Sequence, residues 1–262
     1  MPRQLTAQMK SLLRGAVRGE KIAANANTSA ELVRRGLLDS TGALTNDGWK
    51  HAIAMLPLSE QCHHLGITYE KLHGLDFKKA PEIAAWKHYS SIGYVGGHCE
   101  GGPILLLIRS AALNVLAKLN TFGSRQDACN RFTEAQLFIL RDHSDLILNE
   151  VRSVSREVLV QNFTEIYKSP MIQEWYPGLT PEAMASIFDT LTSERLAKIT
   201  LAIMEDPYKY RAGWPDLTMT SGTELLWAEI KTTDRLHMSQ ITTLHRMMPL
   251  LPGKIRVVQL AE

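Results

Sequence analysis

Cysteine is scarce in this chain, and its spacing argues against two kinds of site. Only three of the 262 residues are cysteines, Cys62, Cys99 and Cys129, and no two of them form a Cys-x-x-Cys pair. An odd number of widely separated thiols is typical of a reducing compartment and not of a disulfide framework, and the missing pair argues against a structural zinc site. We therefore expect free thiols and a cytoplasmic protein.

A strong charge of one sign is also missing. The chain holds 29 Lys and Arg against 27 Asp and Glu, which leaves a formal net charge of +2. Such a balance does not by itself indicate a nucleic-acid binder, so contact with DNA would need a local basic patch. The first fifty residues do carry a basic excess: Arg3, Lys10, Arg14, Arg18, Lys21, Arg34, Arg35 and Lys50 against Glu20, Glu31, Asp39 and Asp47.

Long apolar runs are absent as well. The longest apolar stretch, Ile104 to Leu119, is interrupted by Arg109, Ser110, Asn114 and Lys118. A membrane-spanning helix needs about 20 predominantly apolar residues, so we expect this stretch to be a buried helix and we expect no membrane partner. The N-terminus is not followed by the apolar core of a signal peptide. With 45% hydrophobic and 21% charged residues, the composition is that of a globular protein of one or two domains.

A short acidic motif stands near the C-terminus. Pro215-Asp216 is followed, after the intervening residues 217–228, by Glu229-Ile230-Lys231. Residues 218–220 and 225–230 are rich in β-formers and are separated by Ser-Gly-Thr, which predicts a hairpin. Because side chains alternate along a strand, Glu229 and Lys231 should point to one face, with Asp216 at the mouth of the preceding strand.

These residue types at this spacing predict a reaction. Two converging carboxylates form a hard-oxygen site suited to Mg²⁺ or Mn²⁺, with the backbone carbonyl of Ile230 as a further candidate ligand. Such an ion polarises a phosphodiester and lowers the pKa of a bound water, which Lys231 would orient. A Glu-x-Lys on an exposed strand and a Pro-Asp at a turn are each common alone. Their combination is more specific and indicates a metal-dependent nuclease.

The flanking residues carry a family resemblance. Residues 211–216 read Arg-x-Gly-x-Pro-Asp, and the Glu-x-Lys is followed by Asp-Arg-Leu at 234–236 and by Gln240. This segment resembles the VRR-NUC nucleases of the PD-(D/E)xK superfamily. Upstream, residues 94–101 (Tyr-Val-Gly-Gly-His-Cys-Glu-Gly) and 131–137 are similar to the catalytic region of Fanconi-associated nuclease, a branch of that family. The match covers roughly residues 85–262. It departs at Cys99, where the family has Gly, and at 231–235, which lacks the usual Gly and Pro.

The resemblance implies a restriction-endonuclease-like core and a set of roles. It implies that the metal is held by Glu100, Asp216, Glu229 and the Ile230 carbonyl, and that Lys231 is the catalytic lysine. It also implies hydrolysis of flapped, branched or 5′-ended DNA in repair or recombination. Arg211, Arg235 and Gln240 are the candidates for substrate contact, while Arg211 serves equally well as a clamp within its own loop.

The pattern along the chain predicts an α/β protein whose N-terminal half is mostly helical. Residues 1–55 resemble a winged helix, with a helix over 5–16, a second opened by a capping box of Thr28 and Glu31, and a third from Thr45. Arg34 and Arg35 there either contact phosphate or lie on the solvated face of a packing platform. Residues 56–92 are expected to be a helical connector. Residues 93–262 form the nuclease region, with long helices over 104–120 and 128–168 and its core motif at 205–262.

Other interpretations remain open. An antibacterial DNase toxin would use the same nuclease family, and a non-enzymatic DNA-binding regulator would use only the winged-helix-like N-terminus. A degenerate nuclease fold kept for interaction is a third, against which the intact Asp, Glu and Lys argue. The expected partner is DNA at the bacterial nucleoid, and a homodimer is an alternative to a single copy.

Overall fold

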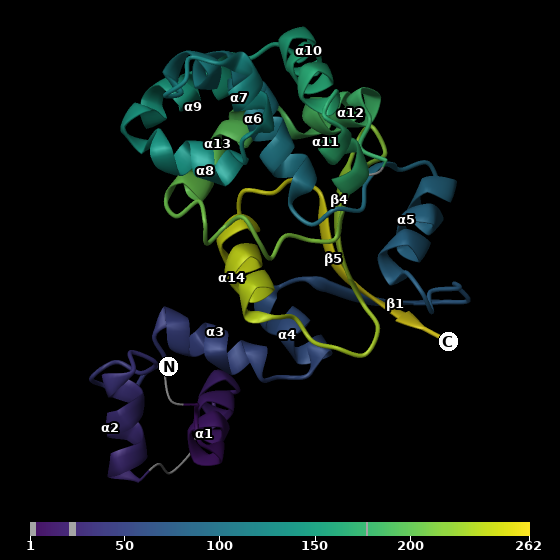
Figure 1. Cartoon of the computed structure of the whole chain (residues 1–262). Coiled ribbons are helices and arrows are strands. Elements are labelled where there is room, and N and C mark those ends of the chain that lie inside the picture. Colours follow the sequence, from purple (N-terminus) through teal and green to yellow (C-terminus); the bar gives the residue numbers. More distant parts are fainter. Residues whose placement is uncertain (1–3, 21–24, 177) are drawn as a thin grey trace.

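One mixed β-sheet organises the chain (Figure 1). The computed structural model describes residues 4–20, 25–176 and 178–262. The five strands lie in the order β1-β5-β4-β3-β2. Their bounds are β1 Thr68–His73, β2 Val95–Gly97, β3 Leu217–Thr220, β4 Leu225–Lys231 and β5 Lys254–Ala261. β2, β3 and β4 form an antiparallel meander, whereas β4, β5 and β1 run parallel.

Helices surround this sheet on both faces and form a separate lobe beside it (Figure 1). Within the described residues their bounds are α1 Ala7–Val17, α2 Ala26–Arg34, α3 Asn46–Ala54, α4 Leu58–Leu65, α5 Pro81–Ser91, α6 Gly102–Leu119, α7 Arg125–Asn130, α8 Thr133–Ile139, α9 Ser144–Ser153, α10 Arg156–Tyr167, α11 Pro170–Trp175, α12 Pro181–Leu191, α13 Ser193–Met204 and α14 Met238–Met247, with a 3₁₀ turn at Arg141–His143. The α/β class expected from the sequence is confirmed.

The hairpin predicted at 218–230 is present as β3 and β4. The two strands are antiparallel, with Leu217 opposite Ala228. Every residue of both strands is buried, and β4 opens with the apolar run Leu225 to Ala228 that such burial favours. The polar residues Glu229 and Lys231 therefore stand out as buried exceptions at the end of a central strand.

The helical lobe is an insertion between two neighbouring strands. β2 and β3 pair with each other, yet α6 to α13 lie between them in the sequence. The lobe is built around α6, whose buried face includes Leu107, Ala111 and Leu113.

α6 does meet the length and hydropathy criteria of a membrane span, contrary to our expectation, with a mean hydropathy of 1.5. Because 67% of it is buried inside the protein, it has the environment of a core helix.

The single long helix expected over 128–168 is wrong. The chain forms α7, α8, a 3₁₀ turn, α9 and α10 there. Arg131 and Val154 take extended backbone angles that interrupt the helix. Ser155 then caps α10 by accepting a hydrogen bond from the Val158 N–H, because a serine oxygen competes well for the free donors of a first helical turn.

The connector expected over 56–92 is not entirely helical. Residues 68–73 form β1, an edge strand of the sheet that runs parallel to β5. The exposure of its side chains alternates only weakly along the strand. Polar contacts join it to β5: the Tyr69 hydroxyl donates a hydrogen bond to Gln259, and Arg256 donates one of 2.7 Å to Glu70. An edge strand held by polar pairs carries little of the apolar signal that marks a strand in a sequence.

The N-terminal region contains three helices around their own small core, which includes Leu13, Leu32 and Leu38. Thr6 and Thr45 cap α1 and α3. The capping box is wrong, because α2 begins at Ala26 with Asn25 as its cap. Leu38 and Leu44 form an isolated bridge in place of a full hairpin. Arg3 and Lys21, counted in the basic excess, lie outside the described residues.

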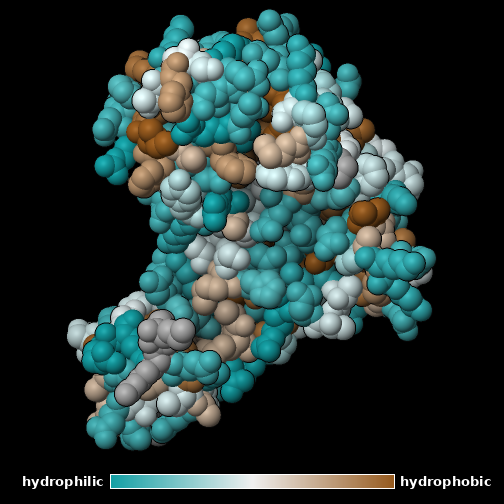
Figure 2. Space-filling view, viewed as in Figure 1, coloured by the Kyte–Doolittle hydropathy of each residue, from teal (hydrophilic) through white to brown (hydrophobic). Residues whose placement is uncertain are grey.

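These N-terminal helices stand apart from the helical lobe, on the other side of α14. Figure 2 shows this side of the molecule hollowed between the helical lobe above and the N-terminal helices below. α3 packs against α14, where Trp49 and His245 have their ring centroids 4.7 Å apart. The sheet and its acidic motif therefore lie between two helical bodies.

Candidate active site

The strand register brings three motif side chains to one face of the sheet. Leu217 pairs with Ala228, so continuing the antiparallel register by one residue sets Asp216 opposite Glu229. Leu226, Ala228 and Ile230 pack toward α5, whereas Leu225 and Trp227 pack toward the helical lobe. By alternation, Glu229 and Lys231 share the face of Trp227. The sequence predicted this convergence.

Glu229 and Lys231 form a buried ion pair. Their side chains are 1% and 6% exposed, and Lys231 Nζ lies 2.8 Å from Glu229 Oε1. The same glutamate oxygen accepts a hydrogen bond from the Gln240 amide of α14. Lys231 also lies 3.2 Å from Asp234 Oδ2. Burying charges is costly unless they are paired, so these contacts hold both groups in fixed positions.

Asp216 is anchored by the neighbouring strand. Its Oδ2 accepts a hydrogen bond of 2.8 Å from the Ile230 N–H. The N–H and C=O of one residue in a strand point to the same side, so the Ile230 carbonyl is directed to the side on which Asp216 lies. Two oxygens that can bind a metal, the Asp216 carboxylate and the Ile230 carbonyl, are thus positioned next to the start of β3.

Glu100 reaches this region from the turn before α6. Its Oε1 accepts a hydrogen bond of 2.6 Å from the Gly213 N–H, and its charge lies at the favourable N-terminal end of that helix. Two glycines permit this approach. Both have positive φ, and a Cβ would lie 2.8 Å from the Trp214 ring at Gly101 and 2.3 Å from the Ser239 oxygen at Gly213. Larger residues would push the three segments apart.

The local electrostatics show that the carboxylates crowd one another. Burial raises the pKa of Asp216, and the nearby Glu82 and Glu100 add to the shift. Burial followed by the charge of Asp216 raises the pKa of Glu229. Burial alone would lower the pKa of Lys231, but Glu229 and Asp234 outweigh it and the net shift is upward. One lysine therefore only partly neutralises a strongly acidic locus.

The site fits a hard divalent cation. Glu229 Oε2 is buried and has no hydrogen-bond partner, which is costly for a carboxylate. Among the described residues no group of three or more Asp, Glu, His or Cys side chains is close enough together to hold a metal ion by itself. The donors that converge here are carboxylate and carbonyl oxygens, and an ion bound by oxygen would satisfy the orphaned atom and reduce the repulsion. Glu100, Asp216, Glu229 and the Ile230 carbonyl are the groups that would hold it.

The three residues expected to contact substrate make contacts within the protein. Gln240 donates to Glu229 and its amide oxygen accepts from the His237 N–H, so it orients the glutamate and also caps α14. Arg235 donates to the Met55 carbonyl. Arg211 lies 3.6 Å from Glu134 of α8, whose side chain is buried. This contact ties the Arg211 loop to α8, while the Arg211 side chain stays 54% exposed.

Two residues near the site were not identified from the sequence. Glu82 opens α5 and adds negative charge beside Asp216. Gln61 is fully buried on α4 and makes hydrogen bonds to the Ile53 carbonyl and to both backbone groups of Leu236. The signal that could have found Gln61 is its place as a polar residue among the apolar residues of one helix face, Leu58, Cys62 and Leu65. Nothing in the sequence places Glu82 next to Asp216.

Comparison with known proteins gives fold neighbours but no sequence relatives. No protein-family model matches the chain, and neither does any curated protein. The crystal structure of paFAN1 bound to 2nt 5′flap DNA with gap matches with a TM-score of 0.52 and 19% identity, over 98% of this chain and 49% of that one. The complex of paFAN1 with 1nt 5′flap DNA with gap gives a TM-score of 0.50 and 18% identity, over 97% and 49%.

The likeness to FAN1 expected from the motifs is thereby confirmed as a likeness of fold. This chain spans about half the length of the paFAN1 chains that it matches. The similarity extends along nearly the whole of the present chain, so it includes the N-terminal helices and the helical lobe as well as the sheet.

Proposed function

We propose that this protein is a metal-dependent DNA nuclease with a PD-(D/E)xK core. The observation that carries the proposal is that the half-buried Asp216 lies opposite the buried Glu229, whose Oε1 is 2.8 Å from Lys231 Nζ. A folded protein keeps two facing carboxylates only where something offsets their repulsion. The meander β2-β3-β4, followed by α14 and the parallel strand β5, supports such a core.

The chemistry is divided among residues of this chain. A bound Mg²⁺ or Mn²⁺ would polarise the phosphodiester and lower the pKa of a water. Lys231 keeps its proton because its pKa is raised, so Nζ donates a hydrogen bond to the attacking water or to a phosphate oxygen. Gln240 holds Glu229 in one orientation, and Glu100 holds the Gly213 loop against the site.

Flap or branched DNA is the proposed substrate. The neighbouring paFAN1 structures contain 5′ flap DNA, and the side of this molecule between its two helical bodies is hollowed (Figure 2). Because the formal net charge is only +2, binding would rest on local contacts and not on the overall field. A role in repair or recombination follows from such a substrate.

The proposal is tested by cleavage of end-labelled flap, nicked, four-way-junction and blunt duplex DNA in Mg²⁺, Mn²⁺ or chelator. We expect cutting by the wild type in the presence of metal only, and a loss of about a hundredfold or more with Asp216→Ala or Glu229→Gln. Glu224→Gln is the matched control, because Glu224 lies on the same hairpin and pairs with the exposed Lys254. Equal cutting by Glu229→Gln and Glu224→Gln would exclude the assigned site.

A further inference from the structure

Three exposed aromatic rings of the helical lobe are each covered by an arginine. The guanidinium carbons lie 5.7, 5.6 and 5.7 Å from the ring centroids in the pairs Arg131–Phe122, Arg141–Phe138 and Arg211–Tyr208. Attraction between a cation and the face of a ring favours such pairs. We call these six residues the arginine–aromatic strip: Phe122, Arg131, Phe138, Arg141, Tyr208 and Arg211.

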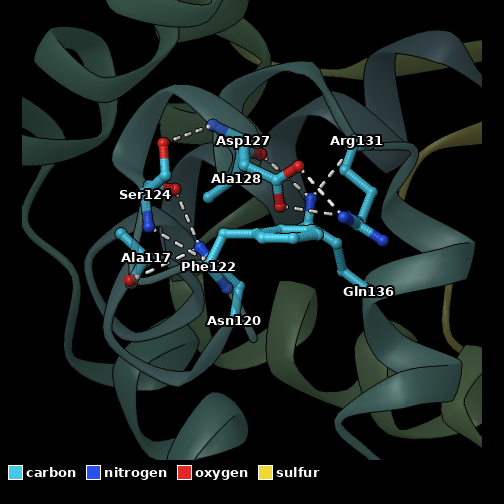
Figure 3. Close-up of polar contacts among 8 residues, drawn as sticks. All are labelled: Ala117, Asn120, Phe122, Ser124, Asp127, Ala128, Arg131 and Gln136. Atoms are coloured by element: carbon cyan, nitrogen blue, oxygen red, sulfur yellow. Dashed lines mark hydrogen bonds and ion pairs between the residues drawn. The ribbon is translucent and has the colours of Figure 1, made fainter.

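Phe138 lies on α8, and Arg131 and Arg141 lie just before and just after this helix. Phe138 and Tyr208 have their centroids 5.4 Å apart, which joins two of the pairs directly. Arg131 and Ile139, the neighbour of Phe138, line one small cavity. Figure 3 shows the Arg131 side chain, paired with Asp127, beside the Phe122 ring. The strip therefore draws on segments from the loop after α6 to the loop after α13, with Phe138 and Tyr208 in direct contact.

This surface is unusual because its rings are in contact with water. Phe122 is 71% exposed, Phe138 46% and Tyr208 47%. Figure 2 shows apolar residues gathered at the surface of this lobe, in the area where Figure 1 labels α8. Large exposed rings add nothing to a core, and a group of them marks a binding surface more often than single scattered residues do.

The strip leads to the candidate active site. Arg211 pairs with Glu134 of α8 at one end of a short loop, and Gly213 of the same loop donates to Glu100. Two residues further on, Pro215 delivers Asp216 to the end of β3. A polymer that binds along the strip and reaches Arg211 would thus arrive beside the carboxylates.

We propose that the arginine–aromatic strip binds an unpaired strand of nucleic acid, the single-stranded arm of the substrate of the proposed nuclease, on which this inference rests. The chemistry selects this occupant. Unpaired bases present flat faces that stack on Phe122, Phe138 and Tyr208, while the three guanidinium groups meet the phosphates. A duplex hides its base faces within the stack and leaves the rings without partners, so the strip should distinguish unpaired from paired strands.

Binding measured without cleavage tests the proposal. Fluorescence anisotropy of a labelled single-stranded oligothymidylate and of a blunt duplex is recorded in chelator, so that no strand is cut. We expect Phe138→Ala and Tyr208→Ala each to weaken single-strand binding about fivefold or more and to leave duplex binding unchanged. Phe138→Tyr should retain single-strand binding because it keeps a ring. Ile92→Ala is the matched control, since Ile92 is an equally exposed apolar residue at 59% exposure far from the strip in sequence.

Several outcomes would overturn the proposal. Unchanged single-strand binding by the double variant Phe138→Ala/Tyr208→Ala would do so, and so would an equal loss on single strand and duplex. A change in self-association without a change in DNA binding would assign the strip to a second copy of the chain. Both side chains are exposed, so thermal melts should match the wild type. If the protein cleaved none of the DNA substrates but still bound single strands in a way that depends on the rings, the nuclease proposal would be refuted and the binding role of the strip would stand.

Discussion

At the scale of single residues, Glu229 occupies a position that a fold made for stability would give to an apolar side chain. It lies in a central strand, is 1% exposed and keeps one oxygen without a hydrogen-bond partner. Lys231 and Gln240 engage only the other oxygen. Sites that break a rule of local stability are expected where function requires it. The strain is electrostatic, so it should respond to pH and to removal of charge.

We predict that Asp216→Asn stabilises the protein in chelator at pH 8 by about 1–3 kcal/mol. The pKa of Asp216 is raised in the folded state, so the folded state binds more protons than the unfolded chain as the pH rises from the ordinary pKa to the raised one. Wild-type stability should therefore be fully present below the ordinary pKa and should fall as the pH climbs through that window. The asparagine keeps an acceptor for the Ile230 N–H.

Thermal melts between pH 4 and pH 8 check this expectation. Asp76→Asn is the control, because Asp76 is an exposed carboxyl whose loss should change little at any pH. If the gain from Asp216→Asn were the same at pH 4 as at pH 8, charge repulsion would not be its cause. Added Mg²⁺ should narrow the difference at pH 8, since an ion held by the carboxylates offsets their repulsion.

At the scale of elements, the site depends on how closely the 211–216 loop approaches α14. Thr243 of α14 donates to the Ala212 carbonyl at 2.7 Å. Gly213, one residue later, has φ of +81° and leaves no room for a Cβ against Ser239. The contact sets the direction in which the chain enters β3, and hence where Asp216 lies.

Gly213→Ala should therefore destabilise the protein more than an ordinary glycine substitution at positive φ. Gly222→Ala is the matched control: Gly222 has φ of +89° with nothing within 4 Å of a new Cβ, so its cost is the backbone strain alone, about 1 kcal/mol. We expect Gly213→Ala to cost about 2 kcal/mol or more beyond this, measured by denaturant unfolding. If both substitutions lowered the free energy of unfolding by the same amount, the loop at Gly213 would be able to move away from Ser239 at little cost.

At the scale of the whole molecule, the N-terminal helices are joined to the acidic site. Ile53 of α3 belongs to the same apolar cluster as Ile241 and Leu244 of α14. Gln61 binds the backbone of Leu236, and Arg235 binds the Met55 carbonyl. The loop between β4 and α14 is thus held from the N-terminal side, and α3 shares an apolar cluster with α14.

Gln61→Leu should lower both stability and cleavage. It removes the Gln61 partner of the Leu236 N–H and of the Leu236 carbonyl in a buried position, at a cost of about 2–4 kcal/mol, and it frees the loop that follows Lys231. Asn162→Leu is the comparison, because Asn162 is also buried but bonds only within the helical lobe, to the Ser110 carbonyl and Arg125. We expect it to lower the melting temperature and leave cleavage at low temperature unchanged. If Gln61→Leu cleaved DNA as well as the wild type, the contact between the N-terminal helices and the loop after β4 would not support the site.

The sequence by itself determined the hairpin and its chemistry. β-forming residue types and the Ser-Gly-Thr turn predict β3 and β4 because the controlling interactions are local, and the side-chain types on that hairpin are those of the proposed reaction. The caps Thr6 and Thr45 were predictable for the same reason. The edge strand β1 and the breaks within 128–168 were not, because polar edge pairs and single extended residues leave little pattern.

Only the tertiary structure decided which distant residues meet. Glu82 comes to Asp216, and Gln61 to the loop after β4, from separate segments, and Arg211 with Tyr208 forms a surface together with Phe138 of α8. The physical reason is that burial and long-range contact set the pKa of the carboxylates and the exposure of the rings. A spacing along the chain carries no information about either quantity.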